Sequence, residues 1–316
     1  MALKKLVIVT PALAQANNGN WQTAQRWARM LRSHYRVRLA DRWVQGDEGL
    51  MIALHARRSA ASVAAWRQRD GRPLVLVLTG TDLYRDIDAD DSARQSLQHA
   101  DRLVVLNELG VDRLPLALRS KAHVCLQSCT PRQPQRKTRR HLRALMVGHL
   151  REEKSPQTYF DAARQLDGRS DILLDHIGDG LDPVLADQAR LLMQQQPRYR
   201  WLGGLPHAAT RARIAAAHVL VHASRMEGGA HVVIEAVASG TPVLASRIDG
   251  NLGLLGRDYP GVFDWGDASA LAALLERARD DEAMLPALRA SCDARAGLFH
   301  PERERQTLLT LLSGLA

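Results

Sequence analysis

The fold is decided by the stretch Ser224-Arg-Met-Glu-Gly-Gly-Ala-His-Val-Val-Ile-Glu-Ala-Val-Ala-Ser-Gly-Thr-Pro-Val-Leu-Ala-Ser246. Apolar runs at Val219–His222 and Pro242–Ala245 flank a glycine-containing loop and a helical pattern over His231–Ser239. A strand, a helix and a second strand in this order predict a parallel sheet covered by helices. We expect Gly240 to end the helix, because glycine adopts the left-handed conformation there without steric cost.

The same alternation continues outward to both ends of the chain. Further strands are predicted at Leu6–Thr10, Val37–Ala40, Leu50–Leu54, Leu74–Thr79, Leu103–Leu106, Val124–Gln127, Ala144–Val147, Ile172–Ile177 and Tyr199–Leu202. Further helices are predicted at Trp21–Arg32, Ser59–Arg69, Gln157–Leu166, Pro183–Gln195, Ala208–Ala217, Ala268–Arg279 and Pro301–Leu312. The fold class is therefore α/β, and we expect two Rossmann-like, doubly wound domains that face an interdomain cleft.

A stretch rich in proline, glutamine and arginine, Pro131–Arg140, separates the two halves. It predicts a solvated linker between an N-terminal domain, residues 1–135, and a C-terminal domain, residues 140–296. Residues 297–316 are expected to form a closing helix that packs back on the first domain, with a proline near the helix start.

The charge of the chain is concentrated around this linker. The net charge is +9, and ten Lys or Arg but no Asp or Glu lie between Arg113 and Arg151. The alternative to a linker is a patch for nucleic acid or an anionic membrane. Because no aromatic side chain is interleaved there to stack on bases, we expect no nucleic-acid partner and no peripheral membrane contact.

The composition is that of an ordinary globular protein, with 316 residues, 46% apolar and 24% charged. No apolar run approaches the roughly 20 residues that span a bilayer, so no membrane span is predicted. The three cysteines cannot all form disulfides, which suits a reducing compartment. We therefore expect a cytoplasmic protein.

Two glutamates, Glu227 and Glu235, lie in the central stretch with seven residues between them. Glycines at the start of a helix let backbone N–H groups approach an anion, and the helix dipole favours that anion. A carboxylate just inside the helix, as Glu235 is, suits ribose hydroxyls better than a phosphate. The alternative for Glu235 alone is a charge that complements the helix dipole.

This spacing resembles the E-x7-E motif of the retaining glycosyltransferases of family four, which have the GT-B fold. Val147-Gly-His-Leu-Arg-Glu-Glu-Lys154 resembles the family's strand and loop that present an arginine and a lysine to the nucleotide diphosphate. Ile177-Gly-Asp-Gly180 resembles the next nucleotide-side loop, and Trp201-Leu-Gly203 resembles the loop beside the base. The resemblance covers residues 144–279 in the family's order.

The resemblance implies a metal-independent enzyme that needs no cofactor and takes a UDP-sugar as donor. Arg151 and Lys154 would neutralise the departing diphosphate, and with Glu227 they form the expected catalytic set. The expected nucleotide-sugar-binding residues are Gly148, Gly178, Leu202, Gly203, Gly228, Gly229, Ala230, His231 and Glu235. The sequence departs from the family in two places. Gly228-Gly229-Ala230 replaces a common Gly-Phe-Gly, and His231 stands where an apolar residue is usual.

Polar residues at predicted strand ends and at one helix start are expected to bind the acceptor, since ligands meet open sheets at these ends. They are Asn18, Gly19, Asn20, Thr81, Asp82 and Arg225. The alternatives are an ordinary Asn/Gly turn at residues 17–20, a helix cap at Asp82, and a surface ion pair at Arg225.

A narrower resemblance extends over nearly the whole chain. Gly19-Asn-Trp-Gln-Thr-Ala24, Leu78-Thr-Gly-Thr-Asp-Leu-Tyr-Arg-Asp86 and the segment Ala245–Gly261, together with the motifs above, resemble the selenosugar synthases of selenoneine biosynthesis. This implies that selenophosphate is joined to the sugar of a UDP-sugar, with UDP-N-acetylglucosamine suggested, and that UDP and phosphate are released. A conventional glycosyltransferase for an alcohol acceptor and a catalytically silent nucleotide-sugar-binding protein are the alternatives.

Asp86, Asp88, Asp90 and Asp91 contain Asp-x-Asp patterns, which bind a metal in the other main glycosyltransferase fold. We expect them on a solvated helix and predict no metal site. Neither a Gly-x-Gly-x-x-Gly run after the first strand nor a Gly-Lys-Ser/Thr loop occurs in the chain, so a dinucleotide dehydrogenase and a P-loop enzyme are disfavoured.

Overall fold

The computed structural model describes residues 3–13, 19–69 and 71–315. Its described residues form two compact units. The first comprises Met1–Ser128, Glu227–Gly229 and Pro301–Ala316, and the second comprises Cys129–Met226 and Ala230–His300. These units and the predicted domains divide the chain differently in three places, one of which is residues 297–300, predicted with the closing helix but grouped with the second unit. Residues 129–135 group with the second unit, and Glu227–Gly229 group with the first.

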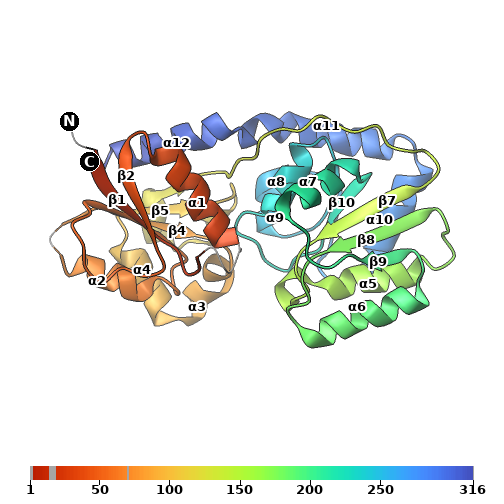
Figure 1. The fold of residues 1–316 in the computed structure, drawn as a ribbon, viewed down its shortest axis with the longest axis horizontal. Coiled ribbons are helices and arrows are strands. Elements are labelled where there is room, and N and C mark those ends of the chain that lie inside the picture. Colours follow the sequence, from red (N-terminus) through yellow and green to blue (C-terminus); the bar gives the residue numbers. More distant parts are fainter. Residues whose placement is uncertain (1–2, 14–18, 70, 316) are drawn as a thin grey trace. The chain divides into compact units, whose positions relative to one another are not determined.

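The first unit contains a parallel six-stranded sheet in the order β2-β1-β3-β4-β5-β6. Its strands are β1 (Lys4–Val9), β2 (Tyr35–Ala40), β3 (Leu50–Leu54), β4 (Leu74–Leu78), β5 (Arg102–Val105) and β6 (Ala122–Val124). Its helices are α1 (Gly19–Leu31), α2 (Ala60–Arg67), α3 (Ile87–Ala89), α4 (Asp91–His99) and α12 (Pro301–Ser313), with a π-helical turn, η2 (Asp82–Asp86). Figure 1 shows α1 and α12 on one face of this sheet and α2 and α4 on the other.

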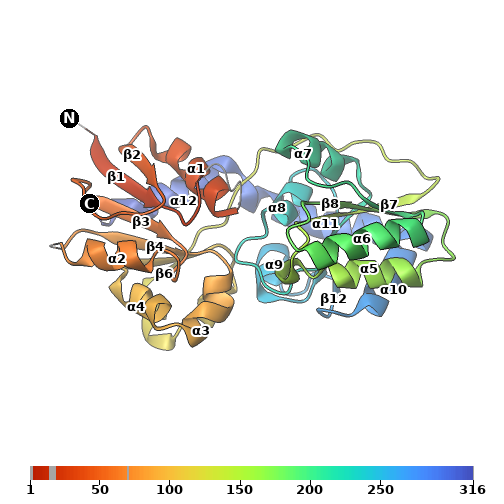
Figure 2. The same cartoon turned by 60° about the horizontal axis from the view of Figure 1, so that its bottom comes forward.

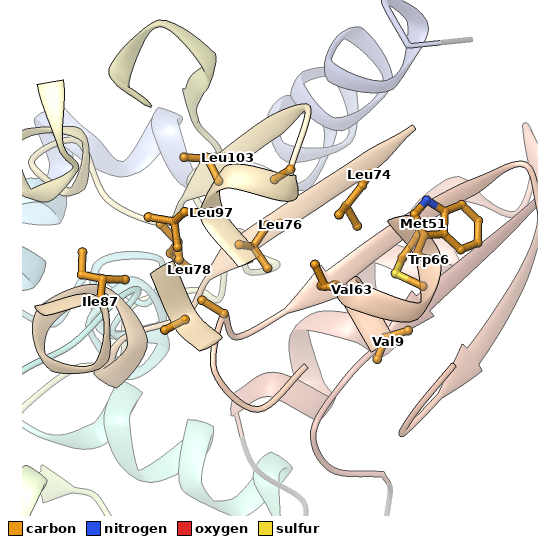
Figure 3. Packing of buried hydrophobic residues seen from close by; sticks show 14 of the residues in the cluster. Val9, Met51, Val63, Trp66, Leu74, Leu76, Leu78, Ile87, Leu97 and Leu103 are labelled. Carbon is orange, nitrogen blue, oxygen red and sulfur yellow. The ribbon is translucent and has the colours of Figure 1, made fainter. Parts of the chain in front are cut away.

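Alternate residues along each strand supply two separate cores, one on each face of the sheet. Leu74, Leu76 and Leu78 of β4 pack with Trp66 of α2 and Leu97 of α4 on one face, as Figure 3 shows. The intervening residues of β4 face α1 and α12, so all five residues of this strand are buried. A strand covered on both faces reads as a continuous apolar run, which is the pattern that the sequence has there.

The second unit contains another parallel six-stranded sheet, in the order β12-β11-β10-β7-β8-β9. Its strands are β7 (Leu142–Val147), β8 (Ile172–Ile177), β9 (Tyr199–Trp201), β10 (Val219–His222), β11 (Val243–Ser246) and β12 (Val262–Phe263). Its helices are α5 (Pro156–Gln165), α6 (Pro183–Gln195), α7 (His207–Ala216), α8 (His231–Val237), α9 (Asp249–Leu255), α10 (Ala268–Asp280) and α11 (Met284–Ala296). In Figure 2, α5, α6 and α10 cover one face of this sheet, and α7 and α8 lie on the other.

The predicted α/β class with two helix-covered parallel sheets is confirmed. The sixth strand was predicted to begin two residues and to end three residues too late, since β6 covers Ala122–Val124. The helices α9 and α11 and the short strand β12 were not predicted, whereas the solvated helix expected around Asp86–Asp91 corresponds to α3 and the start of α4. Helix α9 contains two glycines and α11 a proline in its first turn, and both residue types weaken a helical pattern.

Each sheet has one point at which the order of its strands reverses. In the first unit the chain starts at β1 and adds strands on both sides, so the reversal lies between β1 and β3. In the second unit it lies between β7 and β10. Ligands of open parallel sheets bind beyond the carboxyl ends of the strands at this point. The loops after β1 and β3, and those after β7 and β10, are therefore the places to look for a site.

No helix within the described ranges is both long and apolar enough to cross a membrane.

Candidate functional site

The loops after β7, β8 and β9 meet through their glycines. The Gly148 N–H donates to the Ile177 carbonyl over 2.8 Å, and the Gly178 N–H donates to the Gly203 carbonyl over 2.9 Å. Gly178 has a φ of +153°, and a Cβ atom there would lie 2.0 Å from the Gly148 oxygen. Three of the predicted nucleotide-sugar-binding residues therefore lie together, and glycine is required at the most crowded of them.

A buried histidine that the sequence analysis missed supports this group. His176 Nε2 lies 3.1 Å from the Gly148 oxygen, and its Nδ1 lies 3.1 Å from the Tyr199 hydroxyl. Burial lowers the pKa of His176 to about 4, so the ring is neutral near pH 7. The His176 carbonyl also accepts from the Leu202 N–H over 2.8 Å. A single histidine in an apolar strand gives no local signal of this role.

The predicted cations Arg151 and Lys154 lie on the loop after β7, at and beside a short 3-10 turn. The aliphatic part of Lys154 covers Gly148, because a Cβ atom on that glycine would lie 3.3 Å from Lys154 Cγ. Burial lowers the pKa of the neighbouring His149. The Asp179 carboxylate raises that pKa, and the charges of Arg151 and Lys154 lower it. Arg151 and Lys154 therefore both lie close enough to His149 to act on its charge.

The loop after β10 is joined to the loop after β7, since the Arg225 N–H donates to the Glu153 carbonyl over 2.9 Å. The Arg225 guanidinium lies over the Trp265 ring, 5.0 Å from its centroid, and its Nη1 lies 3.3 Å from Glu152 Oε1. The surface ion pair that was one of two expectations for Arg225 is therefore present. Contact of Arg225 with an acceptor stays a prediction.

Glu235 lies in the first turns of α8 with its carboxylate enclosed by basic side chains. The residue is 4% exposed, and His207 Nε2 lies 2.5 Å from Glu235 Oε1. His231 Nε2 lies 3.7 Å and Arg211 Nε 4.0 Å from the same oxygen. Burial raises the pKa of Glu235, but the His207 hydrogen bond and the charges of His231, His207 and Arg211 outweigh it. The pKa is therefore lower than usual.

His207 and Arg211 were missed by the sequence analysis. Both lie on α7, four residues apart, and so on one face of that helix. This spacing was the available signal, but it does not identify Glu235 on another helix as the partner. Within the second unit, the structure thus brings Glu235 together with the predicted His231 and with these two further residues.

Glu227–Gly229 group with the loops that follow β4 and β5 of the first unit. Asn107 Nδ2 donates to the Gly228 carbonyl over 2.7 Å. A Cβ atom on Gly228 would lie 2.4 Å from the carbonyl carbon and oxygen of Thr79, and one on Gly229 would lie 2.9 Å from Leu106 Cβ. Close packing of backbone therefore requires glycine here, independently of any bound anion. Ala230, the next residue, is buried just before α8.

Asp82 bonds to backbone N–H groups, and its contact with the acceptor stays a prediction. Asp82 is fully buried, and its Oδ1 accepts from the N–H groups of Thr79 and Gly80 over 2.9 and 2.8 Å. Its Oδ2 accepts from the Ala56 N–H over 2.9 Å. Both carboxylate oxygens therefore hold the loops after β3 and β4 in place, which is closer to the capping role that was the alternative.

The other predicted acceptor residues of the first half lie at two places. Gly19 and Asn20 begin α1, whereas Asn18 lies outside the described residues. Thr81 Oγ1 lies 3.1 Å from Nε2 of His55, a buried residue that the sequence analysis did not single out. His55 has a φ of +73°, which is rare for a residue other than glycine. Such backbone strain occurs preferentially at functional sites.

The aspartates of the Asp-x-Asp patterns bond to arginines or to backbone. Asp88 lies 3.4 Å from Arg113, Asp91 pairs with Arg94, and Asp90 accepts from the Ala93 N–H at the start of α4. Within residues 3–13, 19–69 and 71–315, no three His, Cys, Asp or Glu side chains are grouped so as to hold a metal ion.

Comparison with known proteins gives one family and a set of similar structures. Residues 130–296 match the family model described as "Glycosyl transferases group 1". A sucrose-phosphate synthase from Thermosynechococcus elongatus is similar over 99% of both chains, with a TM-score of 0.80 and 18% identity. Anabaena HepE, solved with UDP-glucose, is similar over 98% of this chain and 99% of its own, with a TM-score of 0.79 and 14% identity.

A third similar structure is a UDP-forming α,α-trehalose-phosphate synthase from Burkholderia xenovorans, solved with glucose-6-phosphate. It covers 84% of this chain and 73% of its own, with a TM-score of 0.69 and 12% identity. At these identities the likeness is one of fold.

Proposed function

Since the chain belongs to the group 1 glycosyl transferases, whose family model matches more than half of its length, we propose that it transfers the sugar of a UDP-sugar to selenophosphate. The balanced reaction is UDP-sugar plus selenophosphate plus water to 1-selenosugar, UDP and phosphate. The bond from the anomeric carbon to UDP breaks, a selenium–carbon bond forms, and water cleaves the selenium–phosphorus bond.

The main support for a donor site is that the loops after β7 and β10 lie together at the point where the strand order of the second sheet reverses. The loop after β7 holds Arg151 and Lys154, and the loop after β10 leads to Glu235. Two cations on one of these loops and a carboxylate in the helix after the other suit a nucleoside diphosphate, in which the phosphates need positive charge and the ribose needs hydrogen-bond acceptors. HepE, of similar fold, was solved with UDP-glucose, which supports the choice of donor class.

In this proposal, Arg151 and Lys154 stabilise the negative charge that develops on the departing diphosphate. Glu235 accepts hydrogen bonds from the ribose hydroxyls, and the loops around Gly148, Gly178, Leu202 and Gly203 surround the nucleotide. The resemblance to family four implies that Glu227 would contact the reacting sugar. Because cations on the chain already meet the diphosphate, the proposed reaction needs no metal ion.

The selenophosphate acceptor and the preference for UDP-N-acetylglucosamine rest on the sequence resemblance to selenosugar synthases. The test is to offer several UDP-sugars together with selenophosphate, inorganic phosphate or a simple alcohol, and to detect products by mass spectrometry. A sugar product with the isotope pattern of selenium, formed together with UDP, is the expected result. Lys154→Ala serves as the impaired control.

A sugar joined to the alcohol, without a selenium product, would establish the conventional glycosyltransferase instead. UDP-sugar binding without turnover of any acceptor would establish a silent binding protein.

A further inference from the structure

Two arginines of the first unit share one buried carboxylate. Arg57 Nε donates to Asp86 Oδ2 over 2.9 Å, and Arg85 Nε donates to Asp86 Oδ1 over 3.1 Å. The Asp86 side chain is 5% exposed, whereas those of Arg57 and Arg85 are 41% and 48% exposed. One carboxylate thus fixes two guanidinium groups while leaving both of them open to solvent.

The bonds to Asp86 use one N–H group of each guanidinium. In the described part of the chain, Arg57 and Arg85 each donate a side-chain hydrogen bond through Nε alone. The terminal amino groups of Arg57 and Arg85 are therefore available to a ligand. Guanidinium groups bind tetrahedral oxyanions through two parallel N–H donors, and an arginine that is already held in place loses less conformational entropy on binding.

The pair lies where a ligand of this sheet is expected. Arg57 belongs to the loop after β3, which borders the strand-order reversal between β1 and β3, and Arg85 follows the neighbouring β4. His55 Nε2 lies 3.9 Å from Asp86 Oδ2 and 3.1 Å from Thr81 Oγ1. The ring of His55, whose backbone is in the left-handed conformation, therefore lies between Thr81 and the Asp86 carboxylate that holds the two arginines.

Charged groups of both signs lie around the pair. The buried Asp82 has both oxygens bonded to backbone N–H groups, and burial lowers the pKa of His55, which favours a neutral ring. Asp90 is the nearby acid whose charge interacts with Arg57, and its carboxylate is bonded to Ser92 and the Ala93 N–H. The charges of Arg57 and Arg85 are balanced by those of the buried Asp86 and Asp82, so the attraction for an anion comes from the remaining guanidinium N–H donors and not from an excess of positive charge.

We propose that Arg57 and Arg85, held by Asp86, form the subsite that binds the phosphate-type oxyanion of the acceptor. This inference rests on the proposed function, since it assigns residues to its anionic acceptor. The proposed subsite for a tetrahedral oxyanion belongs to the first unit, whereas the loop of Arg151 and Lys154 belongs to the second.

The kinetic test compares Arg57→Gln and Arg85→Gln with the wild type at saturating UDP-sugar. Each substitution is expected to raise the KM for selenophosphate roughly tenfold or more, because a charge-assisted hydrogen bond is lost, and to leave the KM for UDP-sugar within about twofold. Arg94→Gln is the matched control. It removes an equally exposed arginine that pairs with Asp91 on α4, and it should leave both constants unchanged. Unchanged selenophosphate KM in both variants would overturn the inference.

A binding test separates this inference from the proposed function. Inorganic thiophosphate, a stable analogue of selenophosphate, is titrated into the full chain and followed by ³¹P NMR. Saturable binding that is lost in Arg57→Gln and Arg85→Gln, but kept in Arg94→Gln, supports the subsite even if no selenosugar is ever formed. Binding that all variants retain overturns it, even if selenosugar is formed.

If a glutamine variant fails to fold, as thermal unfolding would reveal, Arg57→Lys and Arg85→Lys replace it. Lysine keeps the charge but loses the planar pair of donors, so it should still weaken thiophosphate binding. Full affinity in both lysine variants would reject an oriented guanidinium site.

Discussion

Asn107 and Gly228 are 121 positions apart in the chain, yet the Asn107 side-chain amide donates to the Gly228 carbonyl over 2.7 Å in a buried contact. This bond ties the residues after Glu227 to the loop that follows β5. The bond joins the side chain of Asn107 to the backbone of Gly228. The backbone of Gly228 also lies close to that of Thr79, so that a Cβ atom on Gly228 would be 2.4 Å from the Thr79 carbonyl. The identity of residue 228 is therefore set by packing.

Gly228→Ala is predicted to lower the free energy of unfolding by roughly 1–3 kcal/mol without any ligand present, since its Cβ atom would overlap the Thr79 carbonyl. Thermal unfolding of the nucleotide-free protein measures this. Gly168→Ala is the control, because a Cβ atom at Gly168 meets no other atom within 4 Å. An undiminished melting temperature in Gly228→Ala would mean that this glycine serves only a bound anion.

Glu235→Gln is predicted to weaken UDP binding by roughly 1.5–3 kcal/mol, and more than Glu227→Gln does. The helix-borne carboxylate is the proposed partner of the ribose, and the amide forms weaker hydrogen bonds to hydroxyl groups. Calorimetric titration with UDP measures both variants. Equal UDP affinity of the wild type and Glu235→Gln would remove Glu235 from the donor site.

His207→Ala is predicted to shift the acid limb of UDP binding to higher pH. In the wild type, the bond from His207 is one of the causes that hold the pKa of Glu235 below its usual value, so the carboxylate stays ionised as the pH falls. Without His207 that pKa rises, and the ionised form is lost at a higher pH. Affinity for UDP is measured as a function of pH, with the exposed His34→Ala as control. Coincident acid limbs for wild type and His207→Ala would contradict this role.

Arg151→Ala and Lys154→Ala are each predicted to lower kcat about 100-fold, because each removes a cation from the departing diphosphate. Substitution of Arg136, Arg139 or Arg140 by alanine should change kcat by less than about twofold, since these are exposed residues of the basic stretch. Steady-state UDP release measures all five variants. Comparable losses in the two groups would show that the basic stretch takes part in the reaction.

Lys137→Met is predicted to stabilise the protein at pH 7. Burial, and to a smaller extent the charge of Arg289, lowers the pKa of Lys137 from 10.5 to about 8, so folding disfavours the charged form of Lys137. That penalty is complete below about pH 8 and disappears as the pH rises towards 10.5, because the unfolded chain binds more protons in this window. Urea unfolding of the wild type should therefore show stability that rises from pH 8 to 10, relative to Lys137→Met. Arg136→Met, an exposed neighbour, is the control.

An equal pH dependence in the wild type and Lys137→Met between pH 8 and 10 would show that Lys137 is not buried with its charge. The Lys137 ammonium has one described hydrogen-bond partner, the Thr241 hydroxyl at 3.3 Å, which does not compensate the charge.

Much of the fold followed from local patterns. Strands such as Leu50–Leu54 and Val219–His222, and the helix Pro183–Gln195, lie at the predicted residues. These elements have long apolar runs, clear helical periodicity or a capping sequence such as Asp182-Pro183, whose signals act within a few residues. The elements that were missed, α9 and α11, carry glycine or proline that hides the same periodicity.

Local patterns were therefore sufficient to predict the α/β class, most strands and helices, and the glycines of the loops after β7 and β8, because propensity, periodicity and tight turns depend on neighbours in the chain. Three contacts are visible only in the folded chain: Asp82 accepts from backbone N–H groups, His207 lies against Glu235, and Arg57 and Arg85 share Asp86. These contacts join residues from different strands and helices. The order of the strands in a sheet determines which loops meet, and no pattern within a single segment encodes that order.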